Sequence, residues 1–359
     1  MACFRYCVAP LNLNGLGNQF FCWAKAFIAS QELGATLLHP AWSRNLRGYR
    51  HLFGTPPLDW EIYRLLTKTL PFFEFNEEDY KTAGGGDYGK AIQAFAQYKG
   101  LNKRKAYVLI TSGMWGGYAA ICHARHFILA QLYAARNTSH HLYSLSKQLH
   151  AGHLTVAVHI RRGDFWTPKQ SGEWKGALNT ALPLEWYVSV CRTLNSHFSG
   201  RLQFLLFSDG SDLELRGFCD EFDPVRMAPE NHSEASDLIA MAAADLLVCS
   251  TSTFSLVAGF LSNAPYLWFE PQLESAADFY SLANEGLTRN DAQVYGTGNE
   301  KSESAAPHQL GLMPRGIPVR DSGHLPDSVL NWLDQRLGFK NPSHDLIYYG
   351  RVPRHLVPA

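Results

Sequence analysis

The stretch "VAVHIRRGDFW", residues 156–166, places two arginines and an aspartate directly after an alternating apolar run. The apolar residues predict a β-strand that ends before Arg161, Arg162 and Asp164. Ligands of open parallel sheets bind outside the carboxyl ends of the strands, and an arginine there offers a planar fork suited to phosphate. The stretch therefore predicts an anion site. The alternative is an exposed turn in which Asp164 neutralises the arginines.

Two other segments have the form of a strand, a polar junction and a helix. "GLGNQ", residues 15–19, has glycines that let the backbone approach a ligand, ahead of a helix whose amino end attracts anions. "CSTSTFS", residues 249–255, has hydroxyls that cap a helix and can hold phosphate oxygens. Taken alone, each segment is also explained by a tight turn or by simple capping. Their agreement with the arginine segment favours a phosphorylated ligand.

Composition and missing motifs argue against several other functions. The chain carries 32 Lys and Arg against 32 Asp and Glu, and this balance disfavours a protein that mainly binds nucleic acid. No D-x-D, C-x-x-C or H-E-x-x-H occurs, so we expect no metal site of those types. Without G-x-x-x-x-G-K-[ST] or G-x-S-x-G, phosphoryl transfer by a P-loop and hydrolase chemistry are also disfavoured.

Cysteine usage and hydropathy bear on the compartment. The seven cysteines are odd in number and scattered, as in proteins of a reducing environment. The first residues lack the basic and apolar regions of a signal peptide, and no run of 18 apolar residues occurs. We therefore expect a cytoplasmic protein without an integral membrane segment.

The order of the predicted elements indicates two α/β domains. At 359 residues the chain exceeds what one core usually organises. Strands and helices alternate from the amino end, and the alternation starts again near residue 150, which indicates parallel sheets. We expect an amino-terminal domain over residues 1–150 and a second domain over residues 151–359. The second domain should end in a polar tail after residue 285, made of loops with one helix over residues 325–337.

Three blocks, in order over about residues 13–270, resemble α-1,2-fucosyltransferases of bacterial type. "NGLGNQFFCWAKAFIASQELGATLL" resembles the opening of that family, and "VAVHIRRGDF" resembles its H-x-R-R-G-D motif, which α-1,6- and protein O-fucosyltransferases share in part. "DLIAMAAADLLVCSTSTFSLVAGFLSN" resembles the third block, and "FSDG" is similar to a motif that usually reads S-D-D. The resemblance is specific because three separate blocks agree.

The resemblance implies an α/β, GT-B-like fold in which two Rossmann-type domains face a cleft. The first domain would be mainly on the acceptor side, and the second would bind GDP-fucose. The reaction would be an inverting, metal-independent transfer of fucose to a sugar hydroxyl, in α-1,2 linkage to galactose of a glycan. The implied partners are GDP-fucose, as the donor substrate, and a glycan acceptor, with no cofactor or metal.

Roles for single residues also follow from the resemblance. His159 and Asp237 would contact guanine, and Arg161 would hold the β-phosphate and act catalytically. Ser252 and Thr253 would contact the diphosphate. The substrate-binding positions implied are Gly15, Gly17, Asn18, His159, Arg161, Arg162, Asp209, Asp237, Ser252 and Thr253.

The acceptor base and several departures from the family pattern leave alternatives open. Glu173 is the first candidate for the base, with an exposed loop carboxylate as its other interpretation, and Asp164 is the second candidate. Leu256 and Val257 replace two tryptophans of the family, and Gly210 replaces the second aspartate of S-D-D. The alternatives are a non-catalytic sugar-nucleotide or glycan binding protein, another linkage (α-1,6 or protein O-linked), and another nucleotide sugar.

Overall fold

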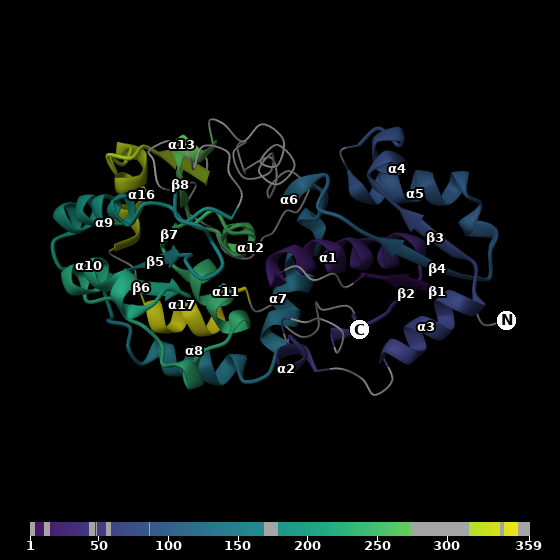
Figure 1. The fold of residues 1–359 in the computed structure, drawn as a ribbon, viewed down its shortest axis with the longest axis horizontal. Helices are drawn as coiled ribbons and strands as arrows, with labels where there is room; N and C mark the ends of the chain where they lie inside the picture. Colours follow the sequence, from purple (N-terminus) through teal and green to yellow (C-terminus); the bar gives the residue numbers. More distant parts are fainter. Residues whose placement is uncertain are drawn as a thin grey trace. The chain divides into compact units, whose positions relative to one another are not determined.

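The protein is an α/β protein with two parallel sheets, seen in a computed structural model (Figure 1). Contacts along the chain divide it into two compact units, and the boundary falls after Arg136. Within the described part of the chain, no helix is long and apolar enough to cross a membrane. The structure describes residues 4–10, 15–42, 47, 49–54, 59–85, 87–168, 179–273, 316–337 and 341–350.

The first unit is built on a sheet in the strand order β2-β1-β4-β3, with every neighbouring pair parallel. Its strands are β1 (Phe4–Val8), β2 (Thr36–Leu37), β3 (Phe72–Phe75) and β4 (Ala106–Thr111). Its helices are α1 (Leu16–Leu33), α2 (Arg50–Phe53), α3 (Asp59–Thr69), α4 (Glu77–Thr82), α5 (Tyr88–Tyr98), η2 (Leu101–Lys103), α6 (Gly117–Ala120), η3 (Cys122–Ala124) and α7 (Arg125–Ala134).

Helix α1 packs on β1 and β4 and is buried along most of its length, as its apolar residues require. It ends at Gly34, whose positive φ of 56° lets its N–H bond back to the carbonyls of Ser30 and Gln31. The indole of Trp23 contacts the rings of Trp42 and Phe127 edge to face. The helix predicted from this segment is confirmed, and aromatic packing holds it in place.

The second unit is built on a sheet in the strand order β6-β5-β7-β8-β9, again entirely parallel. Its strands are β5 (Leu154–Ile160), β6 (Leu202–Ser208), β7 (Leu246–Val248), β8 (Tyr266–Phe269) and β9 (Gly316–Val319). Its helices are α8 (Thr138–Ser146), α9 (Leu184–Phe198), α10 (Asp212–Phe222), η4 (Pro229–Asn231), α11 (Glu234–Ala243), α12 (Thr253–Leu261), α13 (Glu270–Leu273), α16 (Asp327–Leu337) and α17 (Pro342–Tyr348).

Strand β5 lies between the second and third strands of its unit, so the chain leaves it toward β6 and returns on its other side at β7. This strand order has its topological switch point between β5 and β7, where open α/β sheets bind their ligands. All seven residues of β5 are buried, as expected for a strand covered on both faces. The sheet therefore fixes the carboxyl end of β5, where the arginines stand, next to the carboxyl end of β7.

Two features of the second unit differ from the sequence expectations. Helix α8 packs on α11 and α17, and the Ser343 hydroxyl donates to the Ser146 carbonyl, so the unit begins near Asn137 and not near residue 150. The expectation that the tail holds loops and one helix is wrong. Besides α16, the tail contributes edge strand β9 and helix α17, where Pro342 follows the cap residue Asn341.

A buried ion pair ties the tail to the centre of this sheet. The fully buried Asp245, just before β7, accepts hydrogen bonds from the N–H (2.9 Å) and hydroxyl (3.1 Å) of Thr155 on β5. Its other oxygen binds Nε of Arg336 on α16 at 2.9 Å. The carboxylate thereby fixes the amino ends of two central strands and the last described turn of α16.

We expect Asp245→Ala to lower the free energy of unfolding by about 3 kcal/mol, because it leaves Thr155 N–H and Arg336 without their buried anion. Urea unfolding followed by circular dichroism measures this change. Asp334→Ala, on the same helix as Arg336, is the matched control, since it removes an exposed contact with His197 of α9. It should cost less than about 1 kcal/mol. Equal effects of the two substitutions would contradict this role for Asp245.

A buried lysine holds the loop that follows β4 in the first unit. Lys25 on α1 is 0% exposed, and its Nζ donates to the carbonyls of Gly113 (3.0 Å) and Trp115 (2.7 Å). The ammonium lies 3.3 Å from the centre of the Trp115 ring. Burial lowers the pKa of Lys25 to about 7, against smaller opposing effects of Cys22 and Glu77. Lys25 therefore changes charge near neutral pH in the folded protein.

This pKa makes stability depend on pH in a defined direction. Because the folded pKa is lowered, the cost of burying the charge is fully present below pH 7 and is relieved as the pH rises toward the unfolded value of 10.5. We expect the wild-type free energy of unfolding, relative to Lys25→Met, to rise by about 2 kcal/mol between pH 7 and pH 9. Urea titrations of both proteins at the two pH values test this, and a constant difference would refute it.

Candidate anion-binding site

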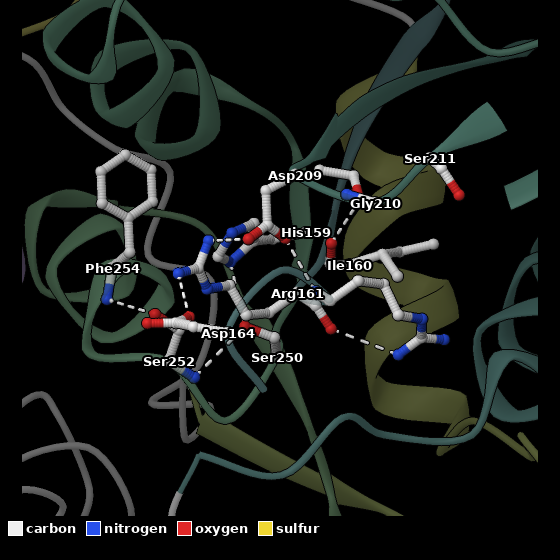
Figure 2. A network of polar contacts seen from close by, with 12 residues as sticks. His159, Ile160, Arg161, Asp164, Asp209, Gly210, Ser211, Ser250, Ser252 and Phe254 are labelled. Carbon is white, nitrogen blue, oxygen red and sulfur yellow. Dashed lines mark hydrogen bonds and ion pairs between the residues drawn. The ribbon is translucent and has the colours of Figure 1, made fainter. Parts of the chain in front are cut away.

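Three strand ends of the second sheet carry the polar residues of the candidate site (Figure 2). Arg161 follows β5, Asp209 follows β6, and Ser250 follows β7. The register pairs Ile160 with Ser208 and Val158 with Val248, so the three ends lie at one edge of the sheet. The "HIRRGD" and "CSTSTFS" segments are therefore brought together at the switch point.

Arg161 is held by two carboxylates. Its Nη1 donates to Oδ2 of Asp209, and its Nη2 donates to Oδ1 of Asp164 at 2.5 Å. The guanidinium carbon also lies 5.2 Å from the centre of the Phe165 ring. The Arg161 side chain is 23% exposed, so the fork is oriented by the protein and remains accessible to a solute. This is a preorganised cation for a phosphate or another oxyanion.

Arg162 has a structural role, because its side chain bonds to backbone carbonyls of the same unit. Its buried guanidinium donates from Nη1 to the carbonyls of Arg161 (3.2 Å) and Leu182 (2.8 Å). Its backbone N–H donates to Oδ1 of Asp209 at 2.7 Å. Asp209 is thus bound by consecutive arginines. These contacts join the loop after β5 to the residues before α9 and after β6, and the substrate contacts expected of Asp209 and Arg162 stay predictions.

Two glycines make this packing possible. Gly163 has a φ of 27°, and a Cβ placed there would collide with the Asp209 carboxylate. A Cβ at Gly210 would lie 2.9 Å from Cγ of Arg162. The departure from S-D-D at Gly210 therefore has a physical reason, because a larger residue would displace the Arg162 stem.

His159 and three serines form a buried polar cluster beside the arginine loop. Nδ1 of His159 lies 2.5 Å from Oγ of Ser255 and 3.1 Å from Oγ of Ser250. The N–H of Ser252 donates to Oγ of Ser250 at 3.2 Å. Burial, with a smaller effect of the Arg161 charge, lowers the pKa of His159 to about 3. The imidazole is therefore neutral at physiological pH and acts by hydrogen bonding.

The serine segment leads into α12, whose amino end faces this cluster. The Ser252 hydroxyl caps the helix by accepting from the N–H of Phe254 at 3.2 Å, and Thr253 begins it. The Thr251 hydroxyl donates to the carbonyl of Thr180 at 2.9 Å. Thr180 also forms an isolated β-bridge with Trp166, so this bond ties the segment to that bridge. Hydroxyls, helix N–H groups and a guanidinium together form a site suited to phosphate oxygens.

Some predicted residues are not joined to this group. Asp237 on α11 binds His232 at 3.0 Å, and no described contact links it to His159. Burial raises the pKa of Asp237, and the hydrogen bond to Asp237 raises the pKa of His232. Glu173 lies outside the described residues. The guanine role of Asp237 and the base role of Glu173 therefore stay predictions.

The predicted glycine-rich residues belong to the first unit. Gly15 is the cap residue of α1, and Gly17 and Asn18 lie in the first turn of the helix itself. The N–H of Asn18 donates to the Gly15 carbonyl at 3.1 Å. In the described chain, the Asn18 side-chain oxygen is buried and has no hydrogen-bond partner. Buried acceptors in folded proteins are usually paired with a donor.

Sequence reasoning missed three members of the site. Ser250 and Ser255, which hold His159, and Thr251, which holds Thr180, lie within the "CSTSTFS" segment but have no predicted role of their own. Their signal is the run of hydroxyls after a buried strand. The described residues contain no group of three or more His, Cys, Asp or Glu side chains that could hold a metal ion.

Comparison of the chain with protein-family models and with curated proteins finds no match. Among solved structures, it is similar to the NodZ α-1,6-fucosyltransferase soaked with GDP-fucose (15% identity, TM-score 0.43), over 72% of this chain and 93% of that one. It is also similar to the NodZ fucosyltransferase from Bradyrhizobium (14%, 0.43; 72% and 94%). A third is POFUT1 in complex with GDP-fucose (12%, 0.43; 74% and 97%). The strand pairing within each unit defines the α/β architecture of this chain.

We expect Gly163→Ala to lower the free energy of unfolding by about 1–3 kcal/mol and to weaken anion binding, because its Cβ displaces Asp209 from Arg161. Gly152→Ala is the matched control, with a positive φ of 77° and nothing within 4 Å of the added Cβ. Urea unfolding and calorimetric titration with inorganic pyrophosphate measure the two effects. Gly163→Ala and Gly152→Ala should differ in pyrophosphate affinity, and equal affinities would rule out the collision as the cause.

Proposed function

We propose that the chain is a fucosyltransferase that binds GDP-fucose at the carboxyl edge of its second sheet and transfers fucose to a glycan hydroxyl with inversion. The observation that carries the proposal is the meeting of Arg161, the His159–serine cluster and the amino end of α12 at the β5–β7 switch point. The segments that form this site are the same ones that resemble the fucosyltransferase blocks. The geometry of the site and the resemblance of its segments therefore support the same position for the diphosphate.

The reaction places its charge where the site has its cation. The bond from the sugar C1 to the β-phosphate oxygen breaks, and its electron pair goes to that oxygen. The acceptor hydroxyl oxygen forms the new bond to C1 from the opposite face, and its proton passes to a carboxylate. Arg161 is oriented to stabilise the negative charge that develops on the leaving phosphate. Glu173 is our first candidate for the base and Asp164 the second.

The other residues have binding roles in this proposal. The neutral His159 and Asp237 contact guanine, and Ser252 and Thr253 bind phosphate oxygens through hydroxyl and N–H groups. The unsatisfied oxygen of Asn18 accepts a hydrogen bond from a ligand hydroxyl, near the turn made by Gly15 and Gly17. Because Arg161 and the helix N–H groups supply the positive charge, the transfer needs no metal. We further propose an α-1,2 linkage to galactose and a cytoplasmic site of action.

A second candidate is a binding protein on the same scaffold, without turnover. Its support comes from the departures from the family pattern at Leu256, Val257 and Gly210. Leu256 and Val257 are buried in α12, and Gly210 packs on Arg162. Such a protein would bind GDP-fucose or a glycan and would not release GDP. An α-1,6 or protein O-linked product is a third outcome, which differs only in the acceptor.

We expect Arg161→Ala to lower kcat for GDP release from GDP-fucose by about 100- to 1,000-fold, because it removes one preorganised donor to the leaving phosphate. Release is measured in EDTA with GDP-fucose, GDP-mannose and UDP-galactose, each with lactose, a broader acceptor panel, or no acceptor. Arg192→Ala is the control, since it removes an exposed arginine bound to Glu221 on helices away from the site.

Each result of this assay selects one function. Release that requires GDP-fucose, survives chelation and is lost in Arg161→Ala supports the transferase. Binding of GDP-fucose without release across the acceptor panel supports the binding protein. Release with another donor alone identifies a different nucleotide sugar, and the linkage follows from analysis of the purified product.

A further inference from the structure

Exposed aromatic side chains lie at the edge of the first sheet where its strands begin. Phe4 is the first residue of β1 and Phe72 the first residue of β3, and they are 53% and 48% exposed. The register sets Phe4 beside Ala106 and Phe72 beside Val108 of β4, the strand that lies between the other two (Figure 1). Both rings therefore lie on the same face of the sheet. Exposed apolar side chains that gather at one place are typical of interaction surfaces.

The same edge carries a local excess of positive charge. Three segments reach it: β1 itself, residues 62–73 from α3 into β3, and residues 95–106 from α5 into β4. Together they contain seven Lys and Arg residues and no Asp or Glu, although the whole chain is balanced at 32 and 32. The carboxylate of Glu74, farther along β3, accepts from the hydroxyl of Ser112, beyond the other end of β4, at 3.0 Å. The edge where the strands begin therefore has an excess of cations.

Two arginines of this edge are held in place with their charges intact. Arg5 donates to the carbonyls of Asn102 (3.2 Å) and Arg104 (2.9 Å). Its guanidinium lies 6.0 Å from the centre of the Tyr107 ring, and that of Arg104 lies 5.1 Å from the centre of the Phe73 ring. Neither a bond to a carbonyl nor a contact with a ring neutralises an arginine. The edge thus presents positioned cations beside its exposed rings.

We propose that this edge binds reversibly to the surface of a membrane that contains anionic lipid. Each Lys or Arg near such a surface adds to the attraction, and exposed Phe and Leu side chains enter the boundary between headgroups and acyl chains. Leu65, one turn before the end of α3, is 61% exposed, and α3 ends two residues before β3 begins. The surface, which we call the basic aromatic edge, consists of Phe4, Arg5, Leu65, Phe72, Lys103 and Arg104.

The apolar members of the basic aromatic edge favour lipid over other polyanions. An acidic polysaccharide would satisfy the cations but would leave Phe4, Leu65 and Phe72 in water. A nucleic acid is disfavoured by the balanced charge of the whole chain. A lipid surface supplies both anionic headgroups and an apolar layer within reach of the side chains.

Docking through this edge concerns the location of the chain and does not rest on the proposed function. Gly15 and Asn18 follow the other end of β1, at the start of α1. The glycine-rich turn of the first unit therefore stays open to solvent when the beginning of the strands meets a membrane. A cytoplasmic protein meets anionic lipid at the cytoplasmic leaflet.

The test is co-sedimentation of the full chain with vesicles of phosphatidylcholine, with and without phosphatidylglycerol. We expect the wild type to bind only the anionic vesicles, and at least about tenfold more weakly at about 0.5 M NaCl. Lys103→Gln with Arg104→Gln should weaken binding about 30-fold. Phe4→Ser with Phe72→Ser should weaken it about tenfold, because the apolar insertion is lost.

The second unit provides matched controls. Lys147→Gln with Arg216→Gln removes two exposed cations, and Leu213→Ser removes a side chain that is 72% exposed. Both controls should bind vesicles like the wild type. Circular dichroism and urea unfolding check the fold of every variant. Lys103 and Arg104 are exposed and precede β4, so their variant decides the question should the phenylalanine variant not fold.

The other outcomes overturn the proposal. Equal binding to both kinds of vesicle, or binding to neither, shows that the edge is no anionic membrane surface. The same loss in the charge variant of the second unit shows that the attraction is not local. Tighter binding to heparin or to single-stranded DNA than to vesicles, with no effect of the phenylalanine substitutions, identifies a polyanion site instead.

Discussion

The carboxylate of Asp209 binds the guanidinium of Arg161 with one oxygen and the backbone N–H of Arg162 with the other. This pair of contacts fixes the turn that follows β5. The glycine at 163 is required because the carboxylate occupies the space of a Cβ, and the glycine at 210 is required because Arg162 packs over it. The loop after β5 and the motif after β6 therefore require each other's residues.

The contact between this loop and this motif depends on the sheet beneath it. Strand β5 is buried along its length between β6 and β7, and its register sets Ile160 opposite Ser208. In a parallel sheet a shift of register would carry Arg161 away from Asp209 and the serines together. Asp245 holds the opposite ends of β5 and β7 through Thr155, so the same two strands are fixed at both edges.

The sequence predicted the class of the fold, and it predicted that the segment with Arg161 and the "CSTSTFS" segment belong to one site. Both predictions were possible because buried parallel strands have continuous apolar sequences that end in polar turns. It did not predict β9, since four residues that include Pro318 resemble a loop, and proline is tolerated there only because β9 is an edge strand. Helix α17 has a cap signal in its sequence, Asn341 before Pro342, but the helix has only seven residues, which are too few for a clear helical period. Contacts between distant residues, such as Arg161 with Asp209, depend on strand order and register, which periodicity does not give.

The site divides into a buried part and a more exposed part. His159 and its serines are buried and bound to one another, and burial keeps the imidazole neutral, so this side offers hydrogen bonds of constant character. The arginine side is more exposed and contains two arginines, Arg161 and Arg162, and two carboxylates, those of Asp164 and Asp209. The buried cluster therefore offers fixed hydrogen-bonding groups, and the arginine side offers a partly accessible cation, so the two sides supply different interactions at the same strand ends.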